Sequence, residues 1–122
     1  MTASIEVAGL DMGAVPSGLD DNFALGTLTL GGADVGNVKL VDSTDNQPSW
    51  SGREALYVSD LVLGSGSSLD LNGINLYYGS LVDNGGTVTL NGGSLTQISE
   101  PATLWVLALS GWLLRRRNVG RA

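Results

Sequence analysis

The chain has 122 residues, with 6 basic and 12 acidic side chains, 18 glycines, no cysteine and no histidine. This length accommodates one small domain, and the missing histidine and cysteine exclude Ser-His-Asp and Cys-His nucleophiles as well as a structural zinc site. All twelve carboxylates lie in residues 1–100, which carry a net charge of −10, whereas residues 101–122 carry +4. An acidic body repels phosphates, so we expect no nucleic-acid partner.

Residues 23–95 consist of short runs of alternating apolar and polar residues, separated by Gly, Asn, Asp and Ser. Alternation with period two places Leu28 and Leu30 on one strand face and their threonine neighbours on the other, and it points Leu69 and Leu71 inward. The glycine-containing separators supply the positive φ that tight turns need. The predicted strands are 27–30, 38–40, 60–63, 68–71, 74–78 and 87–90. No helical period precedes residue 100, so the body is predicted to be all-β.

A weak internal repeat favours one arrangement of these strands. Leu28-Thr29-Leu30 recurs approximately as Leu61-Val62-Leu63 and as Val88-Thr89-Leu90, with spacings of 33 and 27 residues. Short strands with aliphatic ladders and glycine punctuation are typical of a β-solenoid, although a small β-sandwich has similar strand spacing. We therefore expect residues 1–98 to form a Gly-rich, β-solenoid-like body, with a sandwich as the alternative, followed by a single short hydrophobic C-terminal helix.

A polar loop at residues 42–54 interrupts the strand pattern. Asp42 and Asp45 are candidates for holding Ca²⁺, an ion that prefers oxygen ligands. The ligand spacing of an EF-hand is absent, so we favour solvated turn residues and predict neither a metal nor a cofactor. Trp50 is expected to cover the edge of the core, and a binding role for its ring is the alternative.

Two further patterns are compatible with specific functions. Thr27-Leu28-Thr29 and Thr87-Val88-Thr89 are similar to the Thr-x-Thr faces of ice-binding solenoids, but the intervening strands carry other residues, and threonine is a common exposed strand residue. The nearest pairs of carboxylates, Asp20-Asp21 and Glu54 with Asp60, lie in no recognisable glycosidase motif. We therefore predict no catalytic residue and no enzymatic activity.

The segment after Glu100 changes character. Residues 102–114 are uncharged and would form a helix of about 20 Å, shorter than the roughly 30 Å hydrocarbon core of a bilayer. Tryptophans suit membrane interfaces, and arginines mark the cytoplasmic side and can snorkel. A soluble helix packed on the body is the alternative to a membrane anchor. The residues proposed to lie in the lipid bilayer are Leu104, Trp105, Val106, Leu107, Leu109, Trp112, Leu113 and Leu114, and those that set topology are Arg115, Arg116 and Arg117, in a basic tail of residues 115–121.

Residues 99–122 resemble the PEP-CTERM sorting signal of bacterial exported proteins, which is also called the ice-binding protein C-terminal domain. The motif is Ser99-Glu100-Pro101-Ala102, followed by the apolar segment and the arginines. Ser99 stands where the family usually has its first proline. Residues 55–97 also look like the last repeats that precede this signal in large surface proteins.

The resemblance implies a protein exported across the inner membrane, anchored there by its C-terminal helix, and then processed by exosortase, a membrane-embedded transpeptidase, for release or display at the cell surface. Exopolysaccharide is a further partner that it implies. Residues 1–30 have no basic residue and no long apolar run, so we expect the reading frame to continue upstream to a secretory signal. The expected function is that of a structural or adhesive surface protein; the alternative is an extracellular carbohydrate- or ice-binding β domain.

Overall fold

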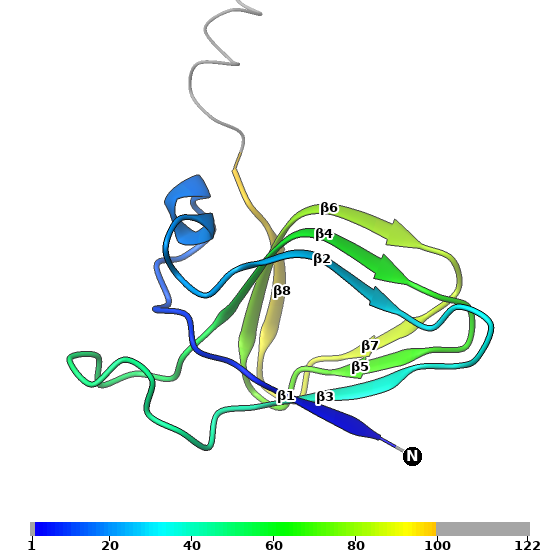
Figure 1. Cartoon of the computed structure of the whole chain (residues 1–122), viewed down its shortest axis with the longest axis horizontal. Coiled ribbons are helices and arrows are strands. Elements are labelled where there is room, and N and C mark those ends of the chain that lie inside the picture. Colours follow the sequence, from blue (N-terminus) through cyan, green and yellow to red (C-terminus); the bar gives the residue numbers. More distant parts are fainter. Residues whose placement is uncertain (1, 100–122) are drawn as a thin grey trace, which may run out of the picture.

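The computed structural model describes residues 2–99, which form strands joined by turns and two longer loops (Figure 1). One short 3-10 helix, η1 (Pro16–Leu19), lies in the first loop. The strands are β1 (Ala3–Glu6), β2 (Leu25–Leu30), β3 (Asn37–Val41), β4 (Leu56–Leu63), β5 (Ser68–Asp70), β6 (Asn75–Asp83), β7 (Thr87–Thr89) and β8 (Ser94–Gln97). The predicted all-β class is therefore confirmed for these residues.

Consecutive strands alternate between two four-stranded sheets. One sheet has the order β1-β3-β5-β7 and the other the order β2-β4-β6-β8, and every pairing between named strands is parallel. In Figure 1 the turns that connect β2 to β3, β4 to β5 and β6 to β7 lie together on the right, and the two longer loops leave the opposite side. Each strand thus pairs with the strand two places further along the chain.

The register confirms only the first of the two predicted repeat spacings. Leu28 pairs with Leu61, which is the spacing of 33 residues expected from the sequence. Leu61, however, pairs with Leu81, at a spacing of 20 residues. Val88 lies in β7 of the other sheet and pairs with Leu69, so its equivalence to Leu61 was wrong. The misleading match arose because similar Leu-Val-Thr strings occur in both sheets.

The strands of the second sheet share a bend. The ladder between β4 and β6 is interrupted at Ser59 and Gly79, and the ladder between β2 and β4 skips the position of Gly26. A side chain at Gly79 would place its Cβ 2.6 Å from the carbonyl oxygen of Ser59, closer than real Cβ contacts come. The bend also changes which alternate residues face the interior. Val58 and Leu61 are three positions apart, an odd number, yet both are fully buried.

The turns predicted from glycine and asparagine do contain positive φ angles. Asn72 and Gly73 have φ values of 53° and 79°, and Asn91 and Gly92 have 47° and 92°. They connect strands of different sheets rather than reversing the chain into hairpins. Leu69 and Leu71 point into the interior as predicted. Strands β1 and β8 were not predicted at all.

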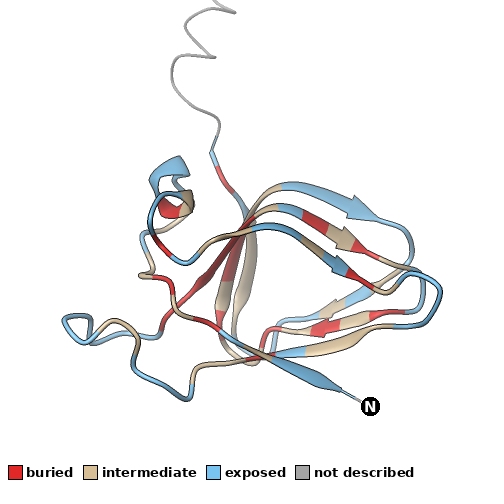
Figure 2. Cartoon of the chain, in the orientation of Figure 1, coloured by how far each residue is buried: buried red, intermediate tan, exposed pale blue. Residues whose placement is uncertain are grey.

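The main core lies between the two sheets and is almost entirely aliphatic (Figure 2). Burial of each Leu or Ile side chain contributes roughly 1.5–3 kcal/mol. Its buried members are Val7, Leu30, Leu40, Leu56, Val58, Leu61, Leu63, Leu69, Leu71, Ile74 and Leu76.

A second, smaller core lies where the first loop covers β4 and β6. The rings of Tyr57 and Tyr77 stack there with centroids 4.8 Å apart. The buried Gly18 of η1 lies against Tyr57, and a Cβ on this glycine would approach the ring to 2.1 Å. The hydroxyl of Tyr57 donates to the carbonyl oxygen of Gly13 at 2.7 Å and accepts the N–H of Met12 at 2.8 Å. The aromatic pair therefore fastens the first loop to the sheet.

Within residues 2–99, no helix reaches the length and apolarity needed for a membrane crossing.

The predicted anchor helix at 102–114 and the arginines that follow it lie outside the described residues.

Candidate functional site

The candidate site lies on the loop between β3 and β4, here called the acidic loop (residues 42–55). The later turns at the same corner, residues 71–74 and 90–93, are far shorter. Arg53 at the end of the loop donates from Nη1 to the carbonyl oxygen of Asn72 at 3.3 Å, which places the loop directly beside the next turn of the chain. The acidic loop is therefore one of two long connections at this corner, the other being residues 7–24 between β1 and β2.

Glu54 organises this loop from inside. Its side chain is only 3% exposed, and Oε2 accepts the backbone N–H groups of Asn46 and Gln47 at 2.7 and 2.9 Å. The side-chain amide of Asn46 donates to Oε1 at 3.1 Å. A buried carboxylate needs such donors to offset its lost hydration, and here the loop wraps around the charge to supply them.

Glu6 holds the start of the same loop. It is the last residue of β1 and accepts the backbone N–H groups of Ser43 and Thr44, both at 3.0 Å to Oε2. The Ser43 hydroxyl donates to Oε1 at 3.1 Å. These donors, the Thr44 N–H foremost, lower the pKa of Glu6 below its ordinary value because they favour the charged carboxylate.

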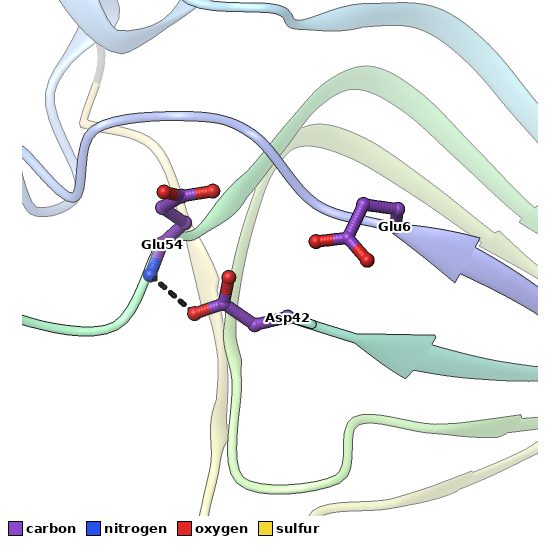
Figure 3. A group of neighbouring side chains, drawn as sticks. All are labelled: Glu6, Asp42 and Glu54. Atoms are coloured by element: carbon purple, nitrogen blue, oxygen red, sulfur yellow. Dashed lines mark hydrogen bonds between the residues drawn. The ribbon is translucent and has the colours of Figure 1, made fainter. Parts of the chain in front are cut away.

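Glu6, Asp42 and Glu54 bring one carboxylate oxygen each within 4.8 Å of one another (Figure 3). Asp42 follows β3, and its Oδ2 accepts the backbone N–H of Glu54 at 3.0 Å. Carboxylate oxygens suit a cation such as Ca²⁺, but that ion takes about six to eight oxygen ligands, and most of the oxygens here already accept hydrogen bonds within the protein. The arrangement accounts for loop folding without an ion.

The two calcium candidates of the sequence, Asp42 and Asp45, both line the pocket on this loop, but only Asp42 belongs to the carboxylate cluster. Oδ1 of Asp45 accepts the N–H of Gln47 at 3.3 Å, in a local turn outside the cluster. Glu6 and Glu54 take its place beside Asp42. Sequence spacing could not reveal Glu6, because only the parallel register of β1 and β3 places it opposite Val41.

A pocket of about 490 Å³ opens on the acidic loop. Trp50 lines it and is 38% exposed, so the prediction that this ring covers the core edge was wrong. Its Nε1 donates to the carbonyl oxygen of Arg53 at 3.1 Å, which holds the indole within the loop. The lining residues are Asp42, Ser43, Thr44, Asp45, Pro48, Trp50, Ser51, Gly52 and Glu54.

The two Thr-x-Thr pairs do not share a surface. Thr27 and Thr29 lie in β2, whereas Thr87 and Thr89 lie in β7 of the other sheet. The neighbours of the first pair in β4 are Asp60 and Val62. A regular array of threonines, which an ice-binding face would need, is therefore not formed by the described strands.

The paired carboxylates considered for hydrolysis have separate surroundings. Glu54 lies in the acidic loop, whereas Asp60 on β4 accepts the Ser80 hydroxyl at 2.6 Å. Of the residues assigned to the sorting signal, only Ser99 is described, and its N–H donates to the carbonyl oxygen of Ala14 at 3.1 Å. Glu100, Pro101, Ala102 and the anchor residues lie outside the described part.

Comparisons of the chain with protein-family models, with curated proteins and with solved structures found no match.

Proposed function

We propose that this chain is an exported structural or adhesive surface protein, held transiently in the inner membrane by residues 102–114 and processed near Glu100-Pro101 by an exosortase-type transpeptidase. In this scheme the three consecutive arginines stay on the cytoplasmic side. The β body is displayed outside the cell and is then released or attached there. No residue of the chain is assigned a catalytic role.

The observation that carries the proposal is the order of parts in residues 99–117. A Ser-Glu-Pro motif, thirteen uncharged residues with a tryptophan near each end, and three arginines follow one another without interruption. Each part alone occurs often by chance. Together they support the proposal of an export signal of the PEP-CTERM type, in which the motif would be read by the enzyme and the arginines would fix orientation.

The β body supports a structural role. We propose that it is a short β-solenoid, since parallel strands offset by 19 or 20 residues alternate between two sheets, whereas β-sandwiches pair antiparallel strands. Parallel stacking of short coils can continue from one repeat to the next, which suits an extended surface protein. The net charge of −10 on residues 1–100 favours solubility of such a surface.

The alternative is an extracellular binding domain. The separation of the threonine pairs between two sheets weighs against its ice-binding form. Its carbohydrate-binding form has one specific feature in its favour, which is the pocket beside Trp50.

A processing assay tests the proposed sorting signal. The chain is expressed behind an added secretory signal, with an epitope after Ala122, in a bacterium that has an exosortase-type enzyme and in a sibling strain that lacks it. We expect the epitope to stay in carbonate-washed membranes of the sibling strain. In the enzyme-containing strain, the intact mass of the body should show loss of the tail.

Paired substitutions sharpen the assay. Glu100→Ala should block loss of the tail, while the control Arg121→Ala, outside the three consecutive arginines, should not. Recovery of the epitope in the soluble fraction of the sibling strain would overturn the anchor. Equal processing in both strains would overturn the assignment to exosortase.

A further inference from the structure

The first loop (residues 7–24) exposes three large apolar side chains. Met12 is 42% exposed, Val15 is 38% exposed, and Phe23, at 65%, is the most exposed large apolar side chain of residues 2–99. Apolar side chains scattered singly over a surface are common and need no partner, whereas a group of them marks a contact surface. What these three residues have near them therefore decides their meaning.

Hydrogen bonds of Asn22 draw these side chains together. The buried side chain of Asn22 accepts the N–H of Leu10 at 2.7 Å and donates to the carbonyl oxygen of Leu10 at 3.0 Å. The same amide donates to the sulfur of Met12 at 3.9 Å, so Met12 lies against the residue that precedes Phe23. Met12 and Phe23 thus leave the loop beside each other, and Val15 follows Met12 by three residues.

The last described residues run along this same loop. The N–H of Ser99 donates to the carbonyl oxygen of Ala14 at 3.1 Å. Ala14 and Ala24 both pack against the smaller core, to which Ile98 belongs. Each of these alanines is the sequence neighbour of an exposed apolar residue. Figure 1 shows the first loop, with η1, beside the place where the chain continues from β8.

The proposed membrane anchor starts very close to this surface. Residue 102 follows Ser99 by three residues, which span at most about 11 Å of extended chain. The headgroup region on each side of the hydrocarbon core is roughly 5–8 Å deep. If residue 102 enters the bilayer, the loop that is bonded to Ser99 must therefore lie at its surface.

We propose that, while the chain is anchored, the first loop inserts Met12, Val15 and Phe23 into the headgroup region of the lipid bilayer. This inference rests on the proposed function, since it takes residues 102–114 as the anchor, and it adds a lipid contact made by the body itself. The other candidate occupant of the surface is the apolar segment 102–114, packed on the loop instead of lying in lipid.

The charges of the loop make this contact weak by itself. Residues 7–24 contain no Lys or Arg, and Asp20 and Asp21 are exposed, so nothing attracts the loop to anionic lipids. Insertion depends on the three apolar side chains, and it becomes effective because the anchor holds them at high local concentration beside the bilayer. Removal of the tail would end that advantage, which suits a body that is released after processing.

The test uses the full chain in phosphatidylcholine vesicles. The chain has no cysteine, so the variants Phe23→Cys and Val15→Cys can each carry one small fluorophore. The matched control is Val35→Cys, because Val35 is also exposed, at 58%, but lies in the turn between β2 and β3 on the opposite side of the body (Figure 1). Spin-labelled lipid quenches a fluorophore in the bilayer, and iodide quenches one in water.

We expect the labels at positions 23 and 15 to be quenched by the spin-labelled lipid. Their quenching by iodide should be about tenfold or more weaker than at position 35, the preference expected when an apolar side chain of this size leaves water. With the label at position 15, Phe23→Ser should lose most of the lipid quenching, whereas Phe23→Leu should keep it. Urea unfolding checks that these variants are folded.

Flotation of the chain with the vesicles reports the anchor separately. If the chain floats but iodide quenches the labels at positions 15 and 23 as strongly as the label at position 35, the lipid contact is overturned and the anchor stands. If neither quencher reaches these two labels, protein covers the loop and the lipid contact is again overturned. A chain that does not float overturns the anchor and this inference together.

Discussion

The phenol of Tyr77 donates a hydrogen bond of 2.7 Å to Oδ1 of Asp11, a residue 66 positions earlier in the chain. The other oxygen of Asp11 accepts the side-chain amide of Asn75 at 2.9 Å. Both donors belong to β6, so a single carboxylate fastens the first loop to the second sheet. The stacked rings of Tyr57 and Tyr77 then lie beneath this loop.

Replacing Tyr77 by Phe should keep the ring stack and remove its hydrogen bond to Asp11. We expect the free energy of unfolding to fall by about 1.5–3 kcal/mol, the usual contribution of a hydrogen bond to a charged group. Urea unfolding monitored by circular dichroism measures the change. Tyr78→Phe is the control, because the Tyr78 hydroxyl has no hydrogen bond within residues 2–99; equal losses in the two variants would contradict the assigned role of Asp11.

The tyrosines also predict a pH dependence. Burial, together with the hydrogen bond to Asp11, raises the pKa of Tyr77 well above its ordinary value of 10.0, and burial raises that of Tyr57. Above about pH 10 the unfolded chain loses these protons while the folded chain keeps them. The stability that these groups contribute should therefore be fully present and independent of pH below about pH 10, and it should decline as the pH rises further. Urea midpoints between pH 8 and 12 test this, and Tyr77→Phe should flatten the decline; an unchanged slope would exclude Tyr77 as its source.

Gly18 should tolerate no side chain. A Cβ there would lie 2.1 Å from Cε2 of Tyr57, so Gly18→Ala must displace either η1 or the stacked ring. Overpacking of this kind costs about 1–3 kcal/mol, and near-ultraviolet circular dichroism of the tyrosines should change. Gly26→Ala is the matched control, since nothing lies within 4 Å of a Cβ at that position. A neutral Gly18→Ala would show that the first loop does not pack on Tyr57.

Glu54→Gln tests whether the buried carboxylate holds the acidic loop in place. Glutamine keeps one side-chain oxygen and has an NH₂ group in place of the other. An NH₂ group cannot accept the N–H groups that bind that oxygen in the parent protein, and leaving such donors unsatisfied costs about 1–3 kcal/mol. Hydrogen exchange at the amides of Asn46 and Gln47 should accelerate about tenfold or more, a factor that corresponds to roughly 1.4 kcal/mol. Asp34→Asn removes a charge at an exposed turn and should leave these amides unchanged. Retained protection in Glu54→Gln would assign the loop's order to other contacts.

The strands were the most predictable part of the fold, because each needs only local alternation. Leu28, Leu30, Leu69 and Leu71 all occupy the positions that period two assigns to them. Strand β8 was missed because its only core residue is Leu95. A single apolar residue creates no alternation, and this strand is specified by pairing with β6 instead.

The acidic loop was predictable as a loop and unpredictable as a site. Its polar composition marks residues 42–54 clearly. The neighbour of Asp42 in the carboxylate cluster is Glu6 of β1, however, and only the pairing of β1 with β3 brings Glu6 there. Trp50 illustrates a different limit. An isolated tryptophan in a polar segment is compatible with a buried cap or with an exposed ring, and only the turn at Pro48 and the bond to Arg53 decide its direction.

The corner between the two sheets accepts segments of very different length without altering the strand ladders on either side. The first two connections at this corner are long loops, whereas the last two, at residues 71–74 and 90–93, are four-residue turns. The turn at 90–93 is closed by the bond from the Gly93 N–H to the carbonyl oxygen of Leu90. Peptides spliced between Asn91 and Gly92 would emerge from the same side as the natural loops. The chain thus offers a scaffold in which loops of different sequence can be exchanged at this corner without changing the aliphatic core.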